Sequence, residues 1–574
     1  MKNDAPAESK AKAPDQGSRT AGLGILSVFV SGSFPASSTG RLLVLGGICA
    51  VTFFLRSGAL PFLGADEPRY AQIAEEMRAS GDWVLPHLQG KPWLEKPPLY
   101  YWLTAACFSL FGSGEAQARL VSAFSIVLLT ATLYFFGKSW FSAESGWIAA
   151  LIFSGSAAAT GFSRAASMDA LFSGLLFLGI CCFGQALFTE REPLRWLFSA
   201  LAGISLGLSV LAKGLLGLAL PAVVLVLFLV WTGTWGRIPW RPLLLGAVLV
   251  PAVSLPWHWM AFQRDGFDFL AIYLVNHHLA RFFTEIHHHT QPFYYYLIVL
   301  PACLLPWTPL LGVLALRRDR LPKQAAAADA VPAQARMLLA ILAVFLTGFF
   351  SLSASKLPGY ILPACPPLAL LMAAGWEGVK NGAQNAVRMK RLLAGCGFLA
   401  LVLGPVFAVL LHRIYELPWP AAAGCGGAYL LGGGGLLYRL YRDPGKAPGS
   451  GSFLILVLAH ALLVVQLSFW AFSPIGLRHS TRDLAQAALT RQEAGELFFS
   501  YRSFHHTLAF YSRGLWQGNL ENPEQLAARL AAIPGAPLLL MTERKWLPEL
   551  VRTSRRPVRT LGEYGPRILV RLQP

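Results

Sequence analysis

Charged residues are scarce in this chain. Only 14% of its 574 residues are Asp, Glu, Lys or Arg, while 55% are hydrophobic. Soluble domains carry about 25% charged residues, so this composition excludes an ordinary soluble protein and indicates a polytopic membrane protein. Acidic residues are the scarcer kind, 30 against 48 basic ones, which gives a net charge of +18. That excess does not indicate nucleic-acid binding, because the Lys and Arg residues gather in short loops between apolar runs.

Cysteine pairs and nucleotide-binding motifs are both missing. The eight cysteines lie mostly inside apolar segments and form no CxxC pair, which excludes a disulfide framework and a zinc knuckle. The sequence has no Walker loop and no G-x-G-x-x-G after a strand, so we expect no nucleotide cofactor. Residues 1–40 are polar and then rich in Ser and Gly, without the plan of a cleaved signal peptide. We expect them to form a disordered cytoplasmic tail.

Long apolar runs are abundant. Thirteen of them approach the roughly 20 residues that a helix needs to cross a bilayer. A shorter run over 98–112, PLYYWLTAACFSLFG, is ambiguous by length alone. The thirteen runs lie at about 41–63, 118–137, 143–162, 168–188, 196–212, 214–232, 241–262, 293–315, 336–353, 358–376, 390–411, 418–440 and 452–472.

The basic clusters decide which side each loop occupies, because Lys and Arg concentrate in cytoplasmic loops. If 98–112 crossed the membrane, the early and late clusters would fall on opposite sides. If it lies in the interface, every cluster is cytoplasmic, so we predict thirteen spans and place the acidic loop after the first span outside. In a Gram-negative cell that side is the periplasm. The clusters are the N-terminal tail, Lys138, Arg191 with Arg195, Arg237 with Arg241, 317–320, 388–391, and 439–442 with Lys446.

The last hundred residues change character. Strand-like runs alternate there with helical patterns, which predicts a small periplasmic α/β domain over 474–574, after a transmembrane catalytic domain over 41–473. The strand-like runs are 496–501, 537–542 and 567–572, and the helical patterns are 523–533 and 544–551.

Several ionisable groups face the outer compartment. Charged groups at membrane depth are costly and usually functional. His278 and Arg281 are spaced to share one face of a helix. The groups are Asp66 and Glu67 after the first span, Glu95 and Lys96 in LEKPP, Asp169 at the outer end of the fourth span, and His278 and Arg281 in the loop 263–292.

Each of these features also has a purely structural interpretation. Asp66 could cap a helix that has Pro68 in its first turn. Asp169 could form an ion pair with Arg164. The run His287–His289 resembles a metal site, but adjacent histidines seldom share one metal, so we expect an ordinary loop there.

An enzyme on this face needs a donor that the membrane itself carries, because ATP and nucleotide sugars are not expected in the periplasm. A lipid-linked donor offers a phosphate that Lys96, Arg281 or Lys356 could bind. Its prenyl chain could lie in grooves between the spans. Glycosyl transfer from a lipid phosphate requires an acid, a base and a cation on one face of the protein, above a groove of this kind.

Five motifs resemble those of a known family. In their order along the chain they are similar to motifs of the bacterial lipid A aminoarabinose transferases, GT-C glycosyltransferases related to protein O-mannosyltransferases. The resemblance covers nearly the whole chain and implies a helical membrane domain with a periplasmic C-terminal domain. One position differs, since the family often has an acid where this chain has His277. The motifs are ADEPRYAQIAEEM, LEKPPLYYWL, SRAASMDALF, NHHLARFF and SKLPGYILP.

The resemblance implies roles for particular residues. Asp66 and Asp169 match the family's paired essential aspartates, and Lys96 matches the lysine that meets the donor phosphate. Glu95 and His278 match positions that bind a divalent metal, for which zinc is the candidate. The predicted substrate-binding residues are Tyr360, which matches a tyrosine near the donor site, together with Arg281, Lys356, Glu67 and Arg69 for their charge and placement.

The implied reaction moves 4-amino-4-deoxy-L-arabinose from undecaprenyl phosphate to a lipid A phosphate, a modification linked to polymyxin resistance. We expect a multi-pass inner-membrane monomer whose site faces the periplasm, among membrane lipids. A second hypothesis keeps the fold but transfers mannose or hexosamine to protein or polysaccharide. A third, a proton-coupled transporter or lipid flippase, is disfavoured because its ionisable groups should lie near the bilayer midplane.

Overall fold

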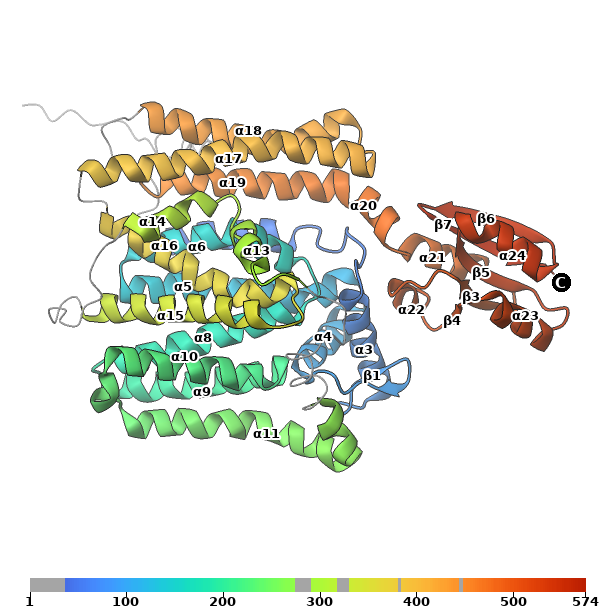
Figure 1. Ribbon diagram of the computed structural model, residues 1–574, viewed down its shortest axis with the longest axis horizontal. Coiled ribbons are helices and arrows are strands. Elements are labelled where there is room, and N and C mark those ends of the chain that lie inside the picture. The colour runs from blue at the N-terminus through green and yellow to red at the C-terminus, as the bar shows by residue number, and fades with distance from the viewer. Residues whose placement is uncertain (1–36, 274–290, 317–329, 380–382, 443–447, 574) are drawn as a thin grey trace, which may run out of the picture.

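The computed structural model describes residues 37–273, 291–316, 330–379, 383–442 and 448–573. It has two parts, a bundle of long helices and a smaller domain of strands and helices at one end of the bundle (Figure 1). The predicted fold class, a helical membrane domain followed by a small α/β domain, is confirmed. All eight cysteines fall within the described residues and are free.

The bundle consists of apolar helices because a backbone in a bilayer must satisfy its own hydrogen bonds. The helices of the bundle and its outer end are α2 (Ser38–Cys49), η1 (Ala50–Phe54), α3 (Asp66–Ser80), α4 (Leu99–Phe111), α5 (Glu115–Trp140), α6 (Ala143–Ser154), α7 (Ala157–Ser163), α8 (Met168–Phe188), α9 (Glu192–Lys213), α10 (Leu216–Thr232), η2 (Thr234–Arg237), α11 (Trp240–Leu270), α13 (Tyr295–Cys303), η4 (Thr308–Leu311), α14 (Gly312–Leu316), α15 (Ala330–Leu352), η6 (Pro358–Ala364), α16 (Cys365–Val379), α17 (Ala383–Tyr415), α18 (Trp419–Arg442), α19 (Gly451–Gln466), η7 (Leu467–Ala471) and α20 (Phe472–His479).

Each of the thirteen predicted spans contains a helix. Among the described residues, eight helices are long and apolar enough to cross a membrane, or up to ten if each of two bent pairs forms one span. The bent pairs are α6 with α7 and the helix pair beginning at Tyr295, which turn by 60° and 113°. The number thirteen therefore stays a prediction.

The ambiguous run 98–112 forms the 13-residue helix α4. At 1.5 Å per residue this helix is only about 20 Å long, shorter than the hydrocarbon core of a bilayer. It lies beside α3 at the end of the bundle that carries the C-terminal domain (Figure 1). Between α3 and α4 the chain forms a small hairpin of β1 (His87–Leu88) and β2 (Lys91–Pro92).

The C-terminal domain is a five-stranded sheet with the order β4-β3-β5-β7-β6. The strands β4, β3 and β5 are parallel, and β7 and β6 continue the sheet in antiparallel fashion. Alternate residues of β5 point to opposite faces, so Leu538 and Leu540 pack in one core and Leu539 and Met541 in the other. The elements are α21 (Arg482–Arg491), β3 (Leu497–Tyr501), α22 (Thr507–Tyr511), β4 (Trp516–Leu520), α23 (Pro523–Ala532), β5 (Leu538–Glu543), η8 (Arg544–Trp546), α24 (Leu547–Ser554), β6 (Val558–Tyr564) and β7 (Arg567–Leu572).

Three strands and two helices of this domain were predicted and are confirmed, while β4 and β6 were missed. The sequence of β4, WQGNL, contains Gly and Asn, which are rare in strands. The register of β6 shifts between Thr560 and Gly562, which breaks its alternation. Both strands are recognisable only from their neighbours in the sheet.

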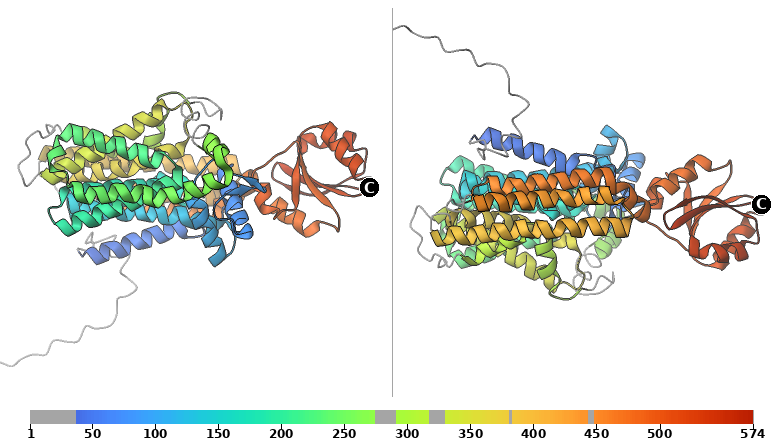
Figure 2. Two further views of the ribbon diagram at one scale, coloured as in Figure 1. Left: turned by 90° about the horizontal axis from the view of Figure 1, so that it is seen from below. Right: turned by 90° about the horizontal axis from the view of Figure 1, so that it is seen from above.

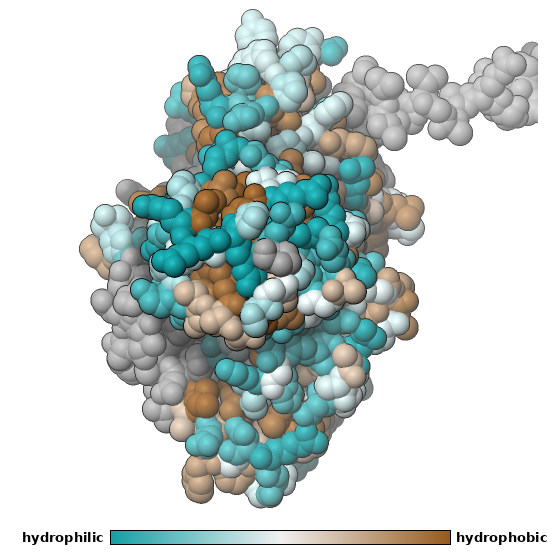
Figure 3. Space-filling model, turned by 90° about the vertical axis from the view of Figure 1, so that its right-hand side faces the viewer, coloured by the Kyte–Doolittle hydropathy of each residue, from teal (hydrophilic) through white to brown (hydrophobic). Residues whose placement is uncertain are grey.

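The C-terminal domain extends from the same end of the bundle as α3 in every view (Figure 2). Seen from that end, hydrophilic side chains cover much of the surface, as expected of a domain in water (Figure 3). The bundle and the domain meet where Phe510 and Tyr511 of α22 pack against a buried cluster that includes Phe62. This contact brings the C-terminal domain to the loop that precedes Asp66, the first residue of α3.

Candidate active site

A buried ion pair between Glu67 and Arg119 anchors the start of α3. The Glu67 carboxylate accepts hydrogen bonds from Arg119 Nε at 2.9 Å and Nη2 at 3.0 Å, and from the Ala166 backbone N–H at 2.7 Å. Arg119 also donates to the carbonyls of Ser57 and Pro61 in the loop before α3. With its carboxylate engaged on all sides, Glu67 ties together the loop after the first span, α5 and the start of α8. Its predicted contact with substrate stays a prediction.

Asp66 is the first residue of α3 rather than its cap. The capping position is Ala65, whose side chain has no hydrogen-bond acceptor. The Asp66 side chain is 58% exposed, and its Oδ1 lies 3.6 Å from Arg69 Nη1. The Arg69 guanidinium lies over the ring of Trp93, 5.2 Å from its centroid. Asp66 therefore presents an accessible carboxylate beside a fixed cation.

Tyr70 connects the two predicted aspartates. Its phenol is buried, and burial raises the pKa of Tyr70 well above its usual value of 10. The charges of Asp66 and of Asp169 each raise this pKa further. The hydrogen bond from the Ala166 N–H to Glu67 joins the start of α3 to the turn before α8, so the two helices bring Asp66 and Asp169 to the same end of the bundle.

Asp169 is paired with Lys213, the last residue of α9. The Lys213 ammonium donates to Asp169 Oδ1, and both side chains are mostly buried, with 8% and 19% exposed. The same ammonium lies 4.7 Å from the ring centroid of Tyr360 and 5.2 Å from that of Phe172. The predicted donor-site tyrosine is thus held beside Asp169 through a lysine that the sequence analysis did not identify.

The turn before α8 explains why Arg164 does not form an ion pair with Asp169. Ser167 caps α8 by accepting from the Asp169 backbone N–H at 3.2 Å, which starts a new helix there. Arg164 ends α7 and donates instead to the carbonyls of Thr52 at 2.7 Å and Leu55 at 2.9 Å. The alternative ion pair between Asp169 and Arg164 is therefore wrong.

The segment SKLPGYILP closes over Asp169. A Cβ on Gly359 would overlap the Asp169 carboxylate, lying 2.8 Å from its Cγ and closer still to Oδ2. Only glycine permits this approach. Lys356, in the same segment, is 6% exposed and donates to the carbonyls of Gln291 at 3.0 Å and Ser353 at 2.6 Å. A donor phosphate would have to replace these carbonyls, so the predicted phosphate contact of Lys356 stays a prediction.

Glu95 and Lys96 lie between the β1–β2 hairpin and α4, both partly exposed and both in contact with other residues. Glu95 and Asp66 are both within electrostatic range of Tyr101 in α4. The other residues predicted from the NHHLARFF motif, His278 and Arg281, lie outside the described residues. Within the described ranges, no three His, Cys, Asp or Glu side chains form a metal-binding group. A metal held by Glu95 and His278 stays a prediction.

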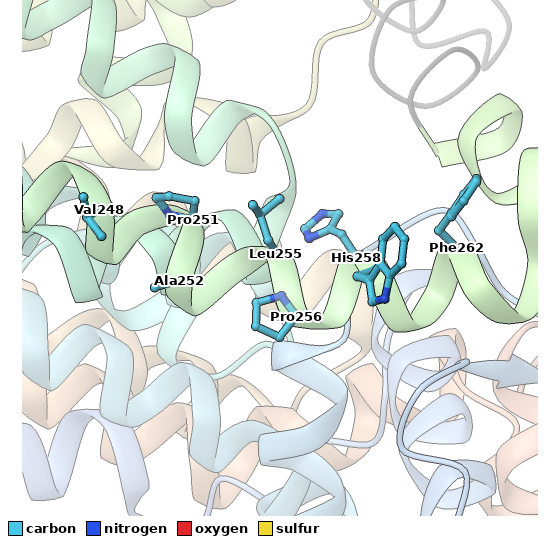
Figure 4. Close-up of a pocket in the computed structure, with 8 residues that line it drawn as sticks. Val248, Pro251, Ala252, Leu255, Pro256, His258 and Phe262 are labelled. Atoms are coloured by element: carbon cyan, nitrogen blue, oxygen red, sulfur yellow. The ribbon is translucent and has the colours of Figure 1, made fainter.

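Two lipid-facing grooves lie on the bundle. The first has a volume of about 740 Å³ and is lined by successive turns of α11, from Val248 to Phe262 (Figure 4). The second, about 440 Å³, lies between α13 and α15 and includes Leu297 and Gly348. Behind the lining of the second groove, the buried ring of Phe350 in α15 lies 5.6 Å from that of Tyr360 and 6.5 Å from that of Tyr296 in α13. The two helices that form this groove are thus connected through aromatic rings to Tyr360, which lies beside Lys213.

Lys213 and Arg119 are two charged residues of this site that sequence reasoning missed. Lys213 stood in the turn between two predicted spans, and a lone cation in an outward-facing turn could have been noticed. Arg119 stood at the outer end of a predicted span, a side on which basic residues are less common, so it too could have been noticed.

Comparison with known proteins matches residues 63–273 to the family model of dolichyl-phosphate-mannose-protein mannosyltransferases. The chain is 34% identical over 355 residues to an undecaprenyl phosphate-alpha-4-amino-4-deoxy-L-arabinose arabinosyl transferase of Pseudomonas savastanoi pv. phaseolicola, over 61% of this chain and 64% of that protein. It is 35% identical over 377 residues to transferase 2 of the same kind from Sodalis glossinidius, over 62% of this chain and 66% of that protein. The chain thus matches less than two thirds of the length of these curated relatives.

The same fold occurs in ArnT from Cupriavidus metallidurans, whose crystal structure contains bound undecaprenyl phosphate. The TM-score is 0.77 at 23% sequence identity, over 93% of this chain and 98% of that one. The likeness to aminoarabinose transferases that the sequence motifs indicated is therefore confirmed, and so is the GT-C type of fold.

Proposed function

We propose, from the likeness of this chain to the aminoarabinose transferases, that it is a lipid-linked-sugar glycosyltransferase of the inner membrane. It transfers 4-amino-4-deoxy-L-arabinose from undecaprenyl phosphate to a phosphate of lipid A at the periplasmic face. The observation that carries this proposal is that the start of α3, where Asp66 lies, is bonded to the turn before Asp169 through Glu67 and the Ala166 N–H, with Lys213 paired to Asp169. We expect the protein to act as a monomer.

The proposed reaction is one displacement at the anomeric carbon of the sugar. The bond from this carbon to the undecaprenyl phosphate oxygen breaks, and its electron pair leaves with the phosphate. An oxygen of the acceptor phosphate forms the new bond. Negative charge grows on the departing phosphate, and Lys96, with Arg281, would stabilise it; such electrostatic stabilisation is often the largest single contribution to catalysis.

The two aspartates have different surroundings and so different roles. The exposed Asp66 can orient the acceptor or pair with the amino group of the sugar, since a lipid A phosphate is already anionic and needs little deprotonation. Asp169 is mostly buried, and its carboxylate holds the Lys213 ammonium against Tyr360. We assign Asp169 to the donor side, next to the ring that the donor is expected to meet.

A divalent metal would add positive charge at the departing phosphate. Glu95 and His278 are the residues proposed to hold it. Glu95 is partly exposed, and its charge and that of Asp66 both raise the pKa of Tyr101.

The prenyl chain of the donor requires an apolar surface that leads to the site. We place it in the α13–α15 groove, because the two helices of this groove are connected through Phe350 and Tyr360 to Lys213. The α11 groove is larger, but its lining comes from one helix alone.

A second candidate function uses the same donor chemistry with another acceptor. The match of residues 63–273 to protein mannosyltransferases favours it, because this stretch contains Asp66, Glu95, Lys96 and Asp169. A protein or polysaccharide hydroxyl has a much higher pKa than a phosphate and would need Asp66 as a general base.

Mass spectrometry of lipid A tests the proposed function. Cells that lack their own transferase would express this chain or its Asp66→Ala variant, with immunoblots of the membrane fraction as the control for expression. A mass increment of one aminoarabinose with the wild type, absent with the variant, is the expected result. Unmodified lipid A in the presence of wild-type protein would contradict the proposal and direct attention to glycoproteins and polysaccharides.

A further inference from the structure

Helix α22 of the C-terminal domain lies along α3. The Phe510 ring packs edge-on to Phe62, with centroids 5.1 Å apart. The Tyr511 hydroxyl accepts from the Phe62 backbone N–H at 2.8 Å and donates to Glu115 at 2.8 Å. Arg482 of α21 reaches the same Glu115 carboxylate at 3.2 Å. An aromatic contact and a polar one thus fix α22 to the loop just before Asp66.

The residues that flank the five-residue helix α22 lie within electrostatic range of charged residues of α3. Near the end of α3, the hydrogen bond from Arg78 lowers the pKa of Glu75, and the charge of Arg513, just past α22, contributes in the same direction. At the start of α3, the partner is His506, the residue that precedes α22. Burial lowers the pKa of His506, Arg69 lowers it further, and Asp66 raises it. The imidazole therefore lies within range of the Asp66–Arg69 pair.

An exposed aromatic ring stands next to this imidazole. Phe504 is 51% exposed, and its ring centroid lies 4.8 Å from that of His506 and 6.0 Å from that of Trp516. An exposed ring in contact with an imidazole that lies within range of Asp66 is a candidate for binding. A flat ring of this kind can pack against the C–H face of a sugar.

The position of these two side chains indicates which substrate they meet. The donor side of the site, with Asp169, Lys213 and Tyr360, lies at the ends of spans. Phe504 and His506 belong to the C-terminal domain, which extends beyond the outer ends of the spans (Figure 1). An acceptor with a sugar head group that stands out of the membrane would meet this domain.

We propose that Phe504 and His506 bind the acceptor, a phosphorylated sugar head group of a lipid, so that the site is complete only with the C-terminal domain docked on α3. His506 donates a hydrogen bond to the acceptor phosphate, and Phe504 packs against the sugar ring. Arg69 supplies the positive charge, and Asp66 orients the reacting oxygen. This inference rests on the proposed function, whose acceptor is lipid A.

Steady-state kinetics of the purified full-length protein test it, with undecaprenyl phosphate-aminoarabinose as donor and lipid A as acceptor. The variants are His506→Ala, His506→Gln and Phe504→Ala. The control is Val551→Ala, which removes an exposed apolar side chain from α24 of the same domain. Thermal unfolding of each variant shows that the fold is kept.

We expect His506→Ala and Phe504→Ala each to raise the KM for lipid A about tenfold, the effect of losing one hydrogen bond or one buried contact. The KM for the donor and kcat at saturating lipid A should change less than about twofold. His506→Gln should recover most of the affinity, because its amide can still donate a hydrogen bond. Val551→Ala should match the wild type.

Unchanged KM for lipid A in both variants, with an active wild type, would overturn this inference and leave the proposed function standing. An equal rise in both KM values would also overturn it, because the residues would then only support the fold. A folded wild type that transfers nothing to lipid A would overturn the proposed function, and the inference with it.

Discussion

Lys213 is the cation that neutralises Asp169, although 44 residues separate them in the sequence. Arg164 is far nearer in the sequence but binds backbone carbonyls of η1 and its end. The pair is mostly buried, and its lysine also contacts the ring of Tyr360. Asp169, Lys213 and Tyr360 therefore form one unit, in which each side chain fixes the position of the others.

Removing the lysine from this unit should abolish most of the transfer activity. Lys213→Met keeps the length of the side chain but leaves Asp169 as an uncompensated, mostly buried charge, which is costly. We expect the rate of aminoarabinose transfer to lipid A to fall at least about 100-fold. The rate measured with purified protein in detergent checks this.

A double-variant cycle separates a shared role from two independent ones. If Asp169 and Lys213 act as a unit, Asp169→Asn with Lys213→Met should be about as defective as the worse single variant. The matched control is Arg264→Ala, which breaks the more exposed ion pair to Asp82 and should keep most of the activity. If the activity losses of the two single variants combined fully in the double variant, Asp169 and Lys213 would act independently, which would contradict their role as one unit.

Gly359→Ala should displace Asp169 without unfolding the protein. The added methyl group would overlap the Asp169 carboxylate, which must then move away from Lys213. We expect transfer to fall at least about tenfold, because small displacements of reacting groups have large effects on rate. Gly434→Ala in α18 is the control, since its Cβ would meet no atom within 4 Å. Equal activity of Gly359→Ala and the wild type would show that the carboxylate can shift without loss.

Glu67→Gln should destabilise the protein more than any change in the exposed ion pairs. The carboxylate accepts from Arg119, Ala166 and Leu63 at once, and an amide can satisfy only part of this set. Breaking a buried pair of this kind costs about 3–5 kcal/mol. The midpoint of thermal unfolding in detergent should therefore fall clearly. Glu75→Gln, which breaks the surface pair with Arg78, should lower it little. Similar midpoints for both variants would refute the anchoring role of Glu67.

The sequence alone was sufficient to predict the helices and strands that depend on a local pattern of residues. Apolar runs of span length predicted the helices of the bundle, and short strand-like runs such as 537–542 predicted the centre of the terminal sheet. The nearest cation in the sequence, Arg164, was a poor guide to the partner of Asp169, because Ser167 starts a new helix between them. Which outer turn approaches Asp169 depends on how α8 packs against α9, and no local pattern encodes that packing.

The contact between the domains was equally hidden. No sequence pattern singled out Phe510 and Tyr511, and only the docked structure shows that they pack on Phe62. Glu67 was predicted to bind substrate, but the structure shows it buried against Arg119. The sequence motifs identified residues that lie at the outer end of the bundle. Which of their charged groups are accessible depends on long-range packing.

His505 should make the stability of the protein sensitive to mild acid. Burial lowers the pKa of His505 to about 4 from its usual 6.5, and Arg567, His506 and His479 contribute in the same direction. The unfolded chain thus binds a proton below about pH 6.5 that the folded domain does not bind until about pH 4, so stability falls as the pH drops through this window. In His505→Gln this contribution is absent. We expect the midpoint of thermal unfolding to fall more for the wild type than for His505→Gln between pH 6.5 and 4, while the difference between the two stays constant from pH 7 to 8. Parallel curves across the acidic window would show that His505 is protonated in the folded domain as readily as in the unfolded chain.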